Sequence, residues 1–331
     1  MNFELTNNVV ICTHVNPDGD AIGSSLALKH YLQRKGKQAT VVVPNIFPDF
    51  LKWLPGADSI LVYTNQREQA KAVIDAASLI IVCDLNQPNR LAGLEETIMA
   101  SSAPRILIDH HLDPDMNFCQ TTYSHPEMCA TAEVICHLLS QWDELDSISF
   151  DEATCLYCAM MCDTGAFSFN SNRPIIYEYI SRLLAHGIDK DEIYRNVFWT
   201  ASEGRLRLQG YLLYVNMKVL HDRNAAIITL TNEERRRFKV KNGDTEGIVN
   251  IPLQMLGTRL SIFINEDTEH PGTMKLSLRS VGDFPCDQMA SRFFGGGGHK
   301  NASGGKLQCS MAEAVEKVKA AIDAYADMLK E

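Results

Sequence analysis

The sequence predicts an α/β fold, with a parallel sheet in an N-terminal domain and a smaller α/β domain in the C-terminal part. In the first half of the chain, short β-rich runs alternate with helical patterns, which is typical of βαβ units. Beyond Gly187 the order changes to a helix, several strands and a final helix. The 331 residues also suffice for about two domains.

The elements of the N-terminal part are short and apolar, as expected for a parallel sheet covered on both faces. Strands are predicted at Val9–Cys12, Ala39–Val43, Ser78–Cys83 and Arg105–Ile108. Helices are predicted at Ala21–Lys35, with Gly36 as the C-terminal cap, and at Ala153–Cys162.

The C-terminal part has a different order of elements. A helix at Glu203–Val215 precedes strands at Ala225–Leu230, Leu260–Ile264 and Met274–Leu278 and a final helix at Met311–Leu329. We therefore expect domains at residues 1–198 and 215–331, joined by a linker helix at 199–214.

The composition is that of an ordinary globular protein, with 45% hydrophobic and 22% charged residues. No apolar run approaches the roughly 18 residues of a membrane helix, and the N-terminus has no basic region followed by an apolar segment. We expect a cytoplasmic protein with no membrane partner. The net charge is −10, but residues 1–200 carry −12 and residues 201–331 carry +2. This division suggests a cation-binding half and an anion-binding half, although an acidic surface also simply keeps proteins soluble.

Ten cysteines are too few for a disulfide scaffold in a chain of this length. Cys155, Cys158 and Cys162 would share one face of a helix. A packed helix is favoured over a zinc site, because the second pair of ligands that a structural zinc motif requires is missing.

Asp and His residues follow three of the predicted strands. They occur at His14 to Asp20 after the first strand, at Asp84, and at Asp109 to His111; Asp163 ends a helical pattern. Ligands in open α/β sheets bind beyond the carboxyl ends of the strands. A single Asp there would be an ordinary cap, but the coincidence of several indicates a common site.

Carboxylates and imidazoles that converge on one site require bound cations, because like charges repel and burial adds a desolvation cost. Oxygen and imidazole donors without thiolate favour Mn²⁺ or Mg²⁺, while zinc, cobalt and iron remain open. Two ions about 3.5 to 4 Å apart would stabilise the attacking and leaving oxygens of a phosphoryl transfer.

The segment from Phe293 to Gly305 contains four consecutive glycines followed by His299, Lys300 and Asn301. It fits a loop whose backbone amides approach an anion, with a flexible linker as the alternative. Arg279 near the end of a predicted strand could bind phosphate or could simply be solvated.

These motifs together resemble the DHH phosphoesterase superfamily. His14-x-x-x-Asp18-Gly19-Asp20, Asp84, Asp109-His110-His111 and Asp163 match its four ordered motifs, and Gly295 to Gly304 is similar to the glycine-rich signature of its DHH-associated C-terminal domain. The phrases Asn16 to Ser24 and Gly296 to Ala302 are similar to those of the nano-RNase/3'-phosphoadenosine-5'-phosphate phosphatase group.

The resemblance implies a role for each residue of the site. Two divalent cations, Mn²⁺ first and Mg²⁺ as the alternative, would be held by His14, Asp18, Asp20, Asp84, His110 and Asp163, with Asp84 shared. His111 would face the scissile phosphate, and Asp109 would orient the imidazoles. The catalytic set is therefore His111, Asp109 and Asp84. In the C-terminal domain the substrate would contact Arg279, Ser280, Gly297, Gly298, His299 and Asn301, across a cleft between the domains.

The function implied by this resemblance is hydrolysis of oligoribonucleotides of two to five nucleotides and dephosphorylation of 3'-phosphoadenosine-5'-phosphate. Residues 1–198 would be the metal-binding catalytic DHH domain, and residues 215–331 the DHH-associated substrate-binding domain. Linear or cyclic di-adenylate phosphodiesterase, pyrophosphatase or exopolyphosphatase, and a non-catalytic nucleotide sensor remain alternatives. We expect no binding of long duplexes, because the net charge is negative. The oligomeric state, including a homodimer, stays open.

Overall fold

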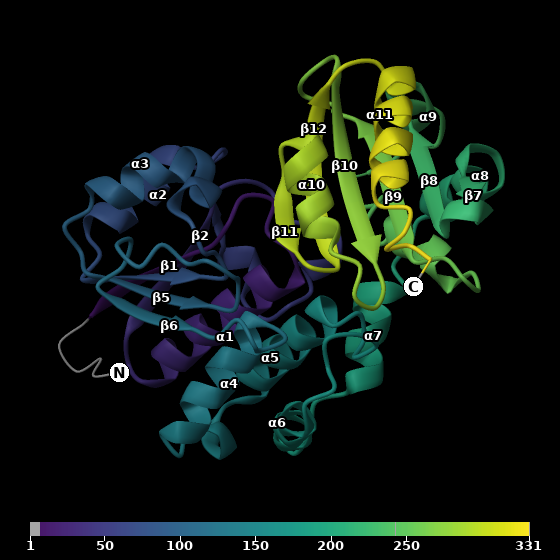
Figure 1. Ribbon diagram of the computed structural model, residues 1–331. Helices are drawn as coiled ribbons and strands as arrows, with labels where there is room; N and C mark the ends of the chain where they lie inside the picture. Colours follow the sequence, from purple (N-terminus) through teal and green to yellow (C-terminus); the bar gives the residue numbers. More distant parts are fainter. Residues whose placement is uncertain (1–6, 242, 331) are drawn as a thin grey trace. The chain divides into compact units, whose positions relative to one another are not determined.

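The computed structural model describes residues 7–241 and 243–330. The chain divides into two compact units, of which the first ends at Thr200 and the second begins at Ala201. Each unit has its own sheet and is described by itself (Figure 1). No helix in the described ranges is long and apolar enough to cross a membrane.

The first unit contains a six-stranded sheet in the order β3-β2-β1-β4-β5-β6, in which all neighbours are parallel. The strands are β1 (Asn8–Cys12), β2 (Gln38–Val43), β3 (Leu61–Val62), β4 (Leu79–Cys83), β5 (Arg105–Asp109) and β6 (Thr121–Ser124). The parallel sheet predicted from the sequence is thus confirmed. The short edge strands β3 and β6 were not predicted, because two to four residues give no clear pattern.

Helices cover both faces of this sheet (Figure 1). One face packs against α1 (Gly19–Arg34), α4 (Thr131–Gln141) and α5 (Phe150–Asp163), the other against α2 (Arg67–Asp75) and α3 (Glu95–Ala100). Alternation along β1 explains this: Val9 and Ile11 belong to the first core, and Val10 and Cys12 to the second. Helices α6 (Pro174–Leu184) and α7 (Lys190–Phe198) pack against α5.

Two glycines allow α1 to approach α5 closely. A Cβ atom at Gly19 would lie 2.3 Å from the Cys162 sulfur, and one at Gly23 would lie 2.7 Å from the Cys155 carbonyl oxygen. Either contact would force the helices apart. This approach brings the N-terminus of α1 to the C-terminal end of α5, where Asp163 is the last helical residue.

The cysteines have the structural role that the sequence predicts. All ten are free thiols, and eight are buried. Cys155 and Cys158 lie in the core, and burial raises the pKa of the Cys155 thiol. Among the described residues, no cysteine belongs to a group with the spacing of metal ligands. The cluster on α5 is therefore a packed helix face.

The second unit contains a mixed sheet in the order β11-β12-β10-β9-β8-β7, in which only β8 and β9 are parallel neighbours. Its strands are β7 (Lys218–Leu220), β8 (Ala225–Leu230), β9 (Leu260–Glu266), β10 (Thr273–Ser280), β11 (Gly297–His299) and β12 (Ala302–Gln308). One face packs against α10 (Cys286–Phe294) and α11 (Met311–Ala324). The other packs against α8 (Glu203–Tyr211) and two short helical segments, Leu212–Asn216 and Ile248–Gln254, while α9 (Asn232–Arg237) follows β8.

Two predicted helices of this unit differ from the structure at their ends. The helix predicted at Glu203–Val215 is α-helical only to Tyr211 and continues as a π-helical turn. The last helix ends at Ala324 instead of Leu329, where the Tyr325 ring contacts Phe284. Leu329 lies beyond the end of this helix but is buried in the core of the second unit, so its apolar character extended the predicted helical pattern.

Candidate metal centre

The loop after β1 and the start of α1 supply the first side chains of the centre. His14 is buried, and its Nδ1 atom lies 2.9 Å from the Val15 carbonyl oxygen. Its Nε2 atom faces carboxylates, at 3.4 Å from Asp84 Oδ2 and 3.9 Å from Asp18 Oδ1. Asp18 also caps α1 by accepting hydrogen bonds from two amides of the first turn. The helix cap thus brings Asp18 to the same point as His14.

Asp84 lies at the middle of the cluster. It follows β4 with a φ of 61°, in the left-handed region that Asp and Asn tolerate better than most residues. Its Oδ2 atom faces His14, whereas Oδ1 accepts a hydrogen bond of 2.8 Å from the Thr131 hydroxyl. Oδ1 also lies 3.7 Å from His110 Nε2 and from His111 Nδ1. Within the described part of the chain, three groups with the spacing of metal ligands share this residue: His14, Asp18, Asp84; Asp20, Asp84, His110; and Asp84, Asp109, His111.

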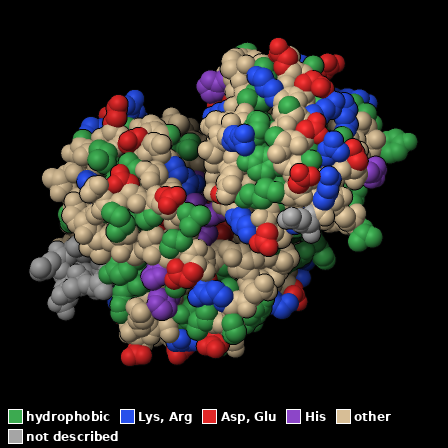
Figure 2. All heavy atoms as spheres, in the orientation of Figure 1, with side chains coloured by type: hydrophobic (Ala, Val, Ile, Leu, Met, Phe, Trp, Pro, Cys, Tyr) green, Lys and Arg blue, Asp and Glu red, His purple; other side chains and the backbone are tan. Residues whose placement is uncertain are grey.

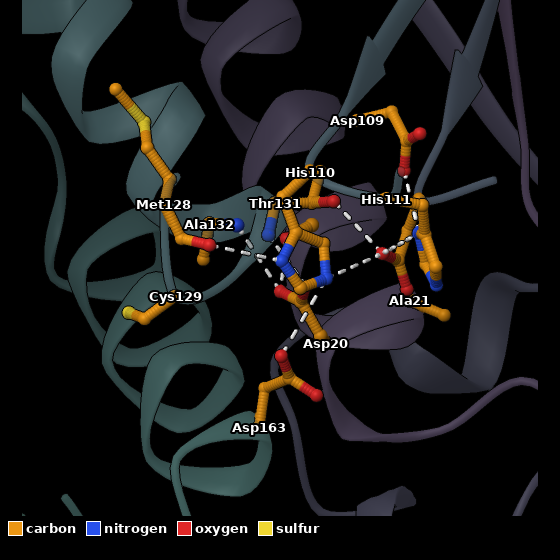
Figure 3. A network of polar contacts seen from close by, with 12 residues as sticks. Asp20, Ala21, Asp109, His110, His111, Met128, Cys129, Thr131, Ala132 and Asp163 are labelled. Atoms are coloured by element: carbon orange, nitrogen blue, oxygen red, sulfur yellow. Dashed lines mark hydrogen bonds and ion pairs between the residues drawn. The ribbon is translucent and has the colours of Figure 1, made fainter. Parts of the chain in front are cut away.

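The two histidines after β5 have different partners. His110 lies with its Nδ1 atom 3.2 Å from the Met128 carbonyl oxygen and its Nε2 atom 3.5 Å from Asp163 Oδ2 (Figure 3). His111 instead pairs with Asp109, at 2.7 Å between Nδ1 and Oδ1. Asp109 is fully buried, and its Oδ2 atom has no hydrogen-bond partner among the described residues. Asp109 therefore orients His111, while a backbone carbonyl orients His110.

The protonation of the centre reflects its crowded carboxylates. Burial and the charges of Asp84 and Asp163 raise the pKa of Asp20 well above its usual value. Burial also acts to raise the pKa of Asp84, but the hydrogen bond with His14 and the charge of His111 outweigh it, so that this pKa is lowered. Burial alone would lower the pKa of His14, yet its hydrogen bond to Asp84 raises it. Added positive charge is thus required to keep Asp20 ionised, whereas the neighbouring imidazoles already favour the ionised form of Asp84.

The donors fit divalent cations. They are carboxylate oxygens and imidazole nitrogens without thiolate, the set that suits Mg²⁺, Mn²⁺ and related ions. The ligand atoms of each group lie within 4.8 Å of one another. Cations would compete with the protons on the imidazoles, since metal ligation requires neutral imidazole and ionised carboxylate.

The N-terminus of α4 contacts both central carboxylates, a feature that sequence analysis did not find. The amides of Thr131 and Ala132 donate to the two oxygens of Asp20, at 2.6 and 3.1 Å (Figure 3). Ser24 donates a further hydrogen bond to Asp20 at 2.9 Å. The only sequence signal is a Thr before an apolar helical pattern, which by itself predicts a helix start.

In the second unit, Arg279 and His299 lie in one row of the sheet. Both are in register with Ala302 of β12, Arg279 from β10 and His299 from β11. Side chains in one row of neighbouring strands point to the same face. Arg279 also donates a hydrogen bond to the Leu278 carbonyl oxygen at 2.9 Å.

The glycine-rich segment forms a β-hairpin, so the linker alternative is wrong. A Cβ atom at Gly296 would lie 1.8 Å from the Gly304 carbonyl oxygen, and one at Gly298 would lie 2.6 Å from the Ala302 carbonyl oxygen. The glycines therefore permit the close approach of two strands, and Gly297 and Gly298 stay exposed on β11.

Ser280 and Asn301 support the turn beside this hairpin. The Ser280 hydroxyl donates to the Phe284 carbonyl oxygen at 2.8 Å, and the Asn301 amide donates to Ser280 Oγ at 2.9 Å. Asn301 also donates to the Gly282 carbonyl oxygen at 3.1 Å. These contacts hold the chain between β10 and α10.

Both halves of the chain match known families. The DHH family N-terminal domain matches residues 8–160, and the DHHA1 domain matches residues 222–330. The bifunctional oligoribonuclease and PAP phosphatase NrnA of Thermus thermophilus is 27% identical over 95% of this chain and 89% of its own length. The cyclic-di-AMP phosphodiesterase GdpP of Bacillus subtilis is 25% identical over 97% of this chain, which corresponds to 48% of that protein.

Solved structures of other proteins share the fold of this chain. An exopolyphosphatase-related protein from Bacteroides fragilis has a TM-score of 0.94 and 49% identity, with 99% of this chain and 95% of that chain covered. The exonuclease RecJ of Thermus thermophilus, solved with Mn²⁺, has a TM-score of 0.51 at 14% identity, over 97% of this chain and 52% of its own, and shares the fold. The chain belongs to the DHH family, with a DHH domain followed by a DHHA1 domain, and is a hydrolase of phosphoester bonds.

Proposed function

We propose that this chain is a divalent-metal-dependent phosphoesterase that hydrolyses oligoribonucleotides of two to five nucleotides to mononucleotides and removes phosphate from 3'-phosphoadenosine-5'-phosphate. The observation that carries the proposal is the shared Asp84, which joins two groups of potential ligands into one centre. The relative named as oligoribonuclease and PAP phosphatase matches nearly the full length of both chains, which supports the substrate class.

In this proposal each side chain of the centre has one task. His14, Asp18 and Asp84 hold one divalent cation, and Asp20, Asp84, His110 and Asp163 hold the other, with Mn²⁺ as the preferred ion and Mg²⁺ as the alternative. When bound, the cations supply positive charge to the phosphoryl oxygens and lower the pKa of an attacking water.

The remaining residues orient groups and bind charge. Asp109 fixes the His111 ring through the 2.7 Å contact, so that His111 can donate a hydrogen bond to a non-bridging oxygen of the scissile phosphate. Because Nδ1 contacts Asp109, the hydrogen bond to the phosphate would come from Nε2 of the doubly protonated ring, in which both nitrogens are donors.

The second unit would bind the part of the substrate away from the scissile bond. Arg279 and His299 share a row of the sheet, and the exposed residues Gly297 and Gly298 precede His299 on β11. A guanidinium and backbone amides are suited to a second phosphate. Ser280 and Asn301 would act by holding the turn at this place. We assign residues 1–198 to the catalytic domain, 199–214 to the linker and 215–331 to the substrate-binding domain.

The surface favours short substrates. On the face of the second unit shown in Figure 2, Lys and Arg side chains are interspersed with Asp and Glu and form no continuous basic track. Long duplexes are bound mainly through many phosphate contacts from such tracks. The overall charge of −10 acts in the same direction.

A substrate panel tests the proposal. We expect kcat/KM for a diadenylate, pApA, and for adenosine 3',5'-bisphosphate to exceed those for cyclic di-AMP, pyrophosphate and polyphosphate, with Mn²⁺ or Mg²⁺ required and products identified by chromatography. Faster turnover of polyphosphate would favour the activity suggested by the name of the Bacteroides fragilis protein, and faster turnover of cyclic di-AMP that of GdpP. If the metal-supplemented chain releases no product from any of them, it is a nucleotide sensor.

A further inference from the structure

Thr131, the first residue of α4, contacts both carboxylates at the middle of the centre. Its hydroxyl donates to Asp84 Oδ1 at 2.8 Å, and its backbone amide donates to Asp20 Oδ2 at 2.6 Å. Thr131 is fully buried, and both carboxylates are buried as well. One residue thus links Asp84, which follows β4, to Asp20 in the first turn of α1.

The start of α4 receives no side-chain cap from the residues next to it in sequence. Residue Ala130 occupies the N-cap position and has no acceptor in its side chain. The first amides of a helix require acceptors, and those of Thr131 and Ala132 find them on Asp20, 111 positions earlier in the chain from Thr131. The helix end in turn favours the negative charge of Asp20.

We propose that Thr131 is a positioning residue, which holds the Asp84 carboxylate in the rotation that divalent cations require while the α4 amides hold Asp20. This inference rests on the proposed function. A carboxylate bound at one oxygen by a fixed hydroxyl cannot rotate about its terminal torsion without breaking that hydrogen bond. Asp84 is the ligand for which this matters most, because it must serve both groups at once.

Three variants of the full-length chain test the inference. Thr131→Val keeps the shape of the side chain and removes the hydroxyl, whereas Thr131→Ser keeps the hydroxyl. Thr154→Val is the matched control, because Thr154 is buried in the same unit and its hydroxyl has no hydrogen-bond partner among the described residues. Each protein is stripped of metal, checked by circular dichroism, and titrated with Mn²⁺ by calorimetry; kcat and KM for pApA are then measured.

We expect Thr131→Val to bind Mn²⁺ about 10- to 100-fold more weakly, as is typical when the partner of a metal ligand is removed. Its kcat should fall at saturating Mn²⁺, while KM for pApA changes little. Thr131→Ser should restore affinity to within about threefold because it restores the donor, and Thr154→Val should match the wild type. Should Thr131→Val fail to fold, Thr131→Ala, which adds no bulk, takes its place.

The outcomes separate this inference from the proposed function. If the wild type binds Mn²⁺ and Thr131→Val binds it equally well, Thr131 does not position the ligand. The inference also fails if Thr131→Ser is as weak as Thr131→Val, since the loss would then come from packing. If the wild type itself binds neither Mn²⁺ nor Mg²⁺, the proposed function falls as well.

Discussion

Replacing Asp20 by Ala should destabilise the metal-free first unit, although it removes a charge from a crowded acidic cluster. Asp20 is fully buried and accepts hydrogen bonds from the Thr131 and Ala132 amides and from the Ser24 hydroxyl. It is therefore the cap of α4 as well as a candidate ligand. Removal of the carboxylate leaves three buried donors without acceptors.

The size of the effect follows from these contacts. Loss of a helix N-cap costs about 1 kcal/mol, and an unsatisfied buried donor such as the Ser24 hydroxyl costs about 1 kcal/mol or more. Removal of Asp20 also relieves the repulsion between its charge and the neighbouring carboxylates, and this gain offsets part of the loss in the free energy of unfolding. We expect a net destabilisation of about 2 kcal/mol, which lowers Tm by about 4–8 °C for a unit of this size.

Asp163→Ala is the control, because it should not lower the stability of the metal-free protein. Asp163 is the last residue of α5, and a negative charge at a helix C-terminus is unfavourable. Its side chain is 31% exposed and also faces His110. The same removal of one acidic group from the same cluster should thus leave stability unchanged or raise it.

Urea denaturation in EDTA, followed by tryptophan fluorescence, measures the difference. All three tryptophans, Trp53, Trp142 and Trp199, lie in the first unit, so the signal reports on that unit alone. If Asp20→Ala unfolds at the same or a higher urea concentration than Asp163→Ala, the capping argument is wrong and Asp20 contributes only charge repulsion to the metal-free protein.

Two further predictions concern turnover and substrate binding. Asp84→Asn should lower kcat by about 10³-fold, from the loss of about 4 kcal/mol of transition-state stabilisation, with a circular dichroism spectrum like that of the wild type; activity near wild type would contradict the shared role. Asn is preferable to Ala because residue 84 has a φ of 61°, which costs Ala about 1 kcal/mol or more. Arg279→Ala should raise KM for pApA by about tenfold or more, which corresponds to the loss of a charge-assisted hydrogen bond. It should raise KM for a small phosphodiester reporter far less. Equal increases in KM for both substrates would show that Arg279 is not an anchor for the substrate.

The convergence of the candidate ligands could be predicted because it follows from strand order. The segments after β1, β4 and β5 are far apart in sequence, but these strands are neighbours in the sheet. Parallel strands present their carboxyl ends at one edge, so His14, Asp84 and His110 meet there. Asp163 is different: it is brought in by a helix, and its place depends on the close approach that Gly19 and Gly23 allow.

The contacts around these ligands could not be predicted from local pattern. The Met128 carbonyl that faces His110 and the Thr131 hydroxyl that faces Asp84 come from a loop and a helix start of ordinary composition. The φ of Asp84 likewise depends on the whole turn after β4. Such features arise from tertiary structure, in which one residue satisfies the backbone of a distant segment.

This arrangement couples metal binding to the packing of the first unit. Asp20 can satisfy the α4 amides and contact a cation at the same time, because a carboxylate has about four acceptor positions. In the metal-free protein its raised pKa reflects burial and the charges of Asp84 and Asp163, and a cation would remove that cost. Binding should therefore stabilise the fold by mass action, by about 2.7 kcal/mol at a free cation concentration of 100 Kd. The same carboxylate that begins a helix thus makes the stability of this unit depend on the ion.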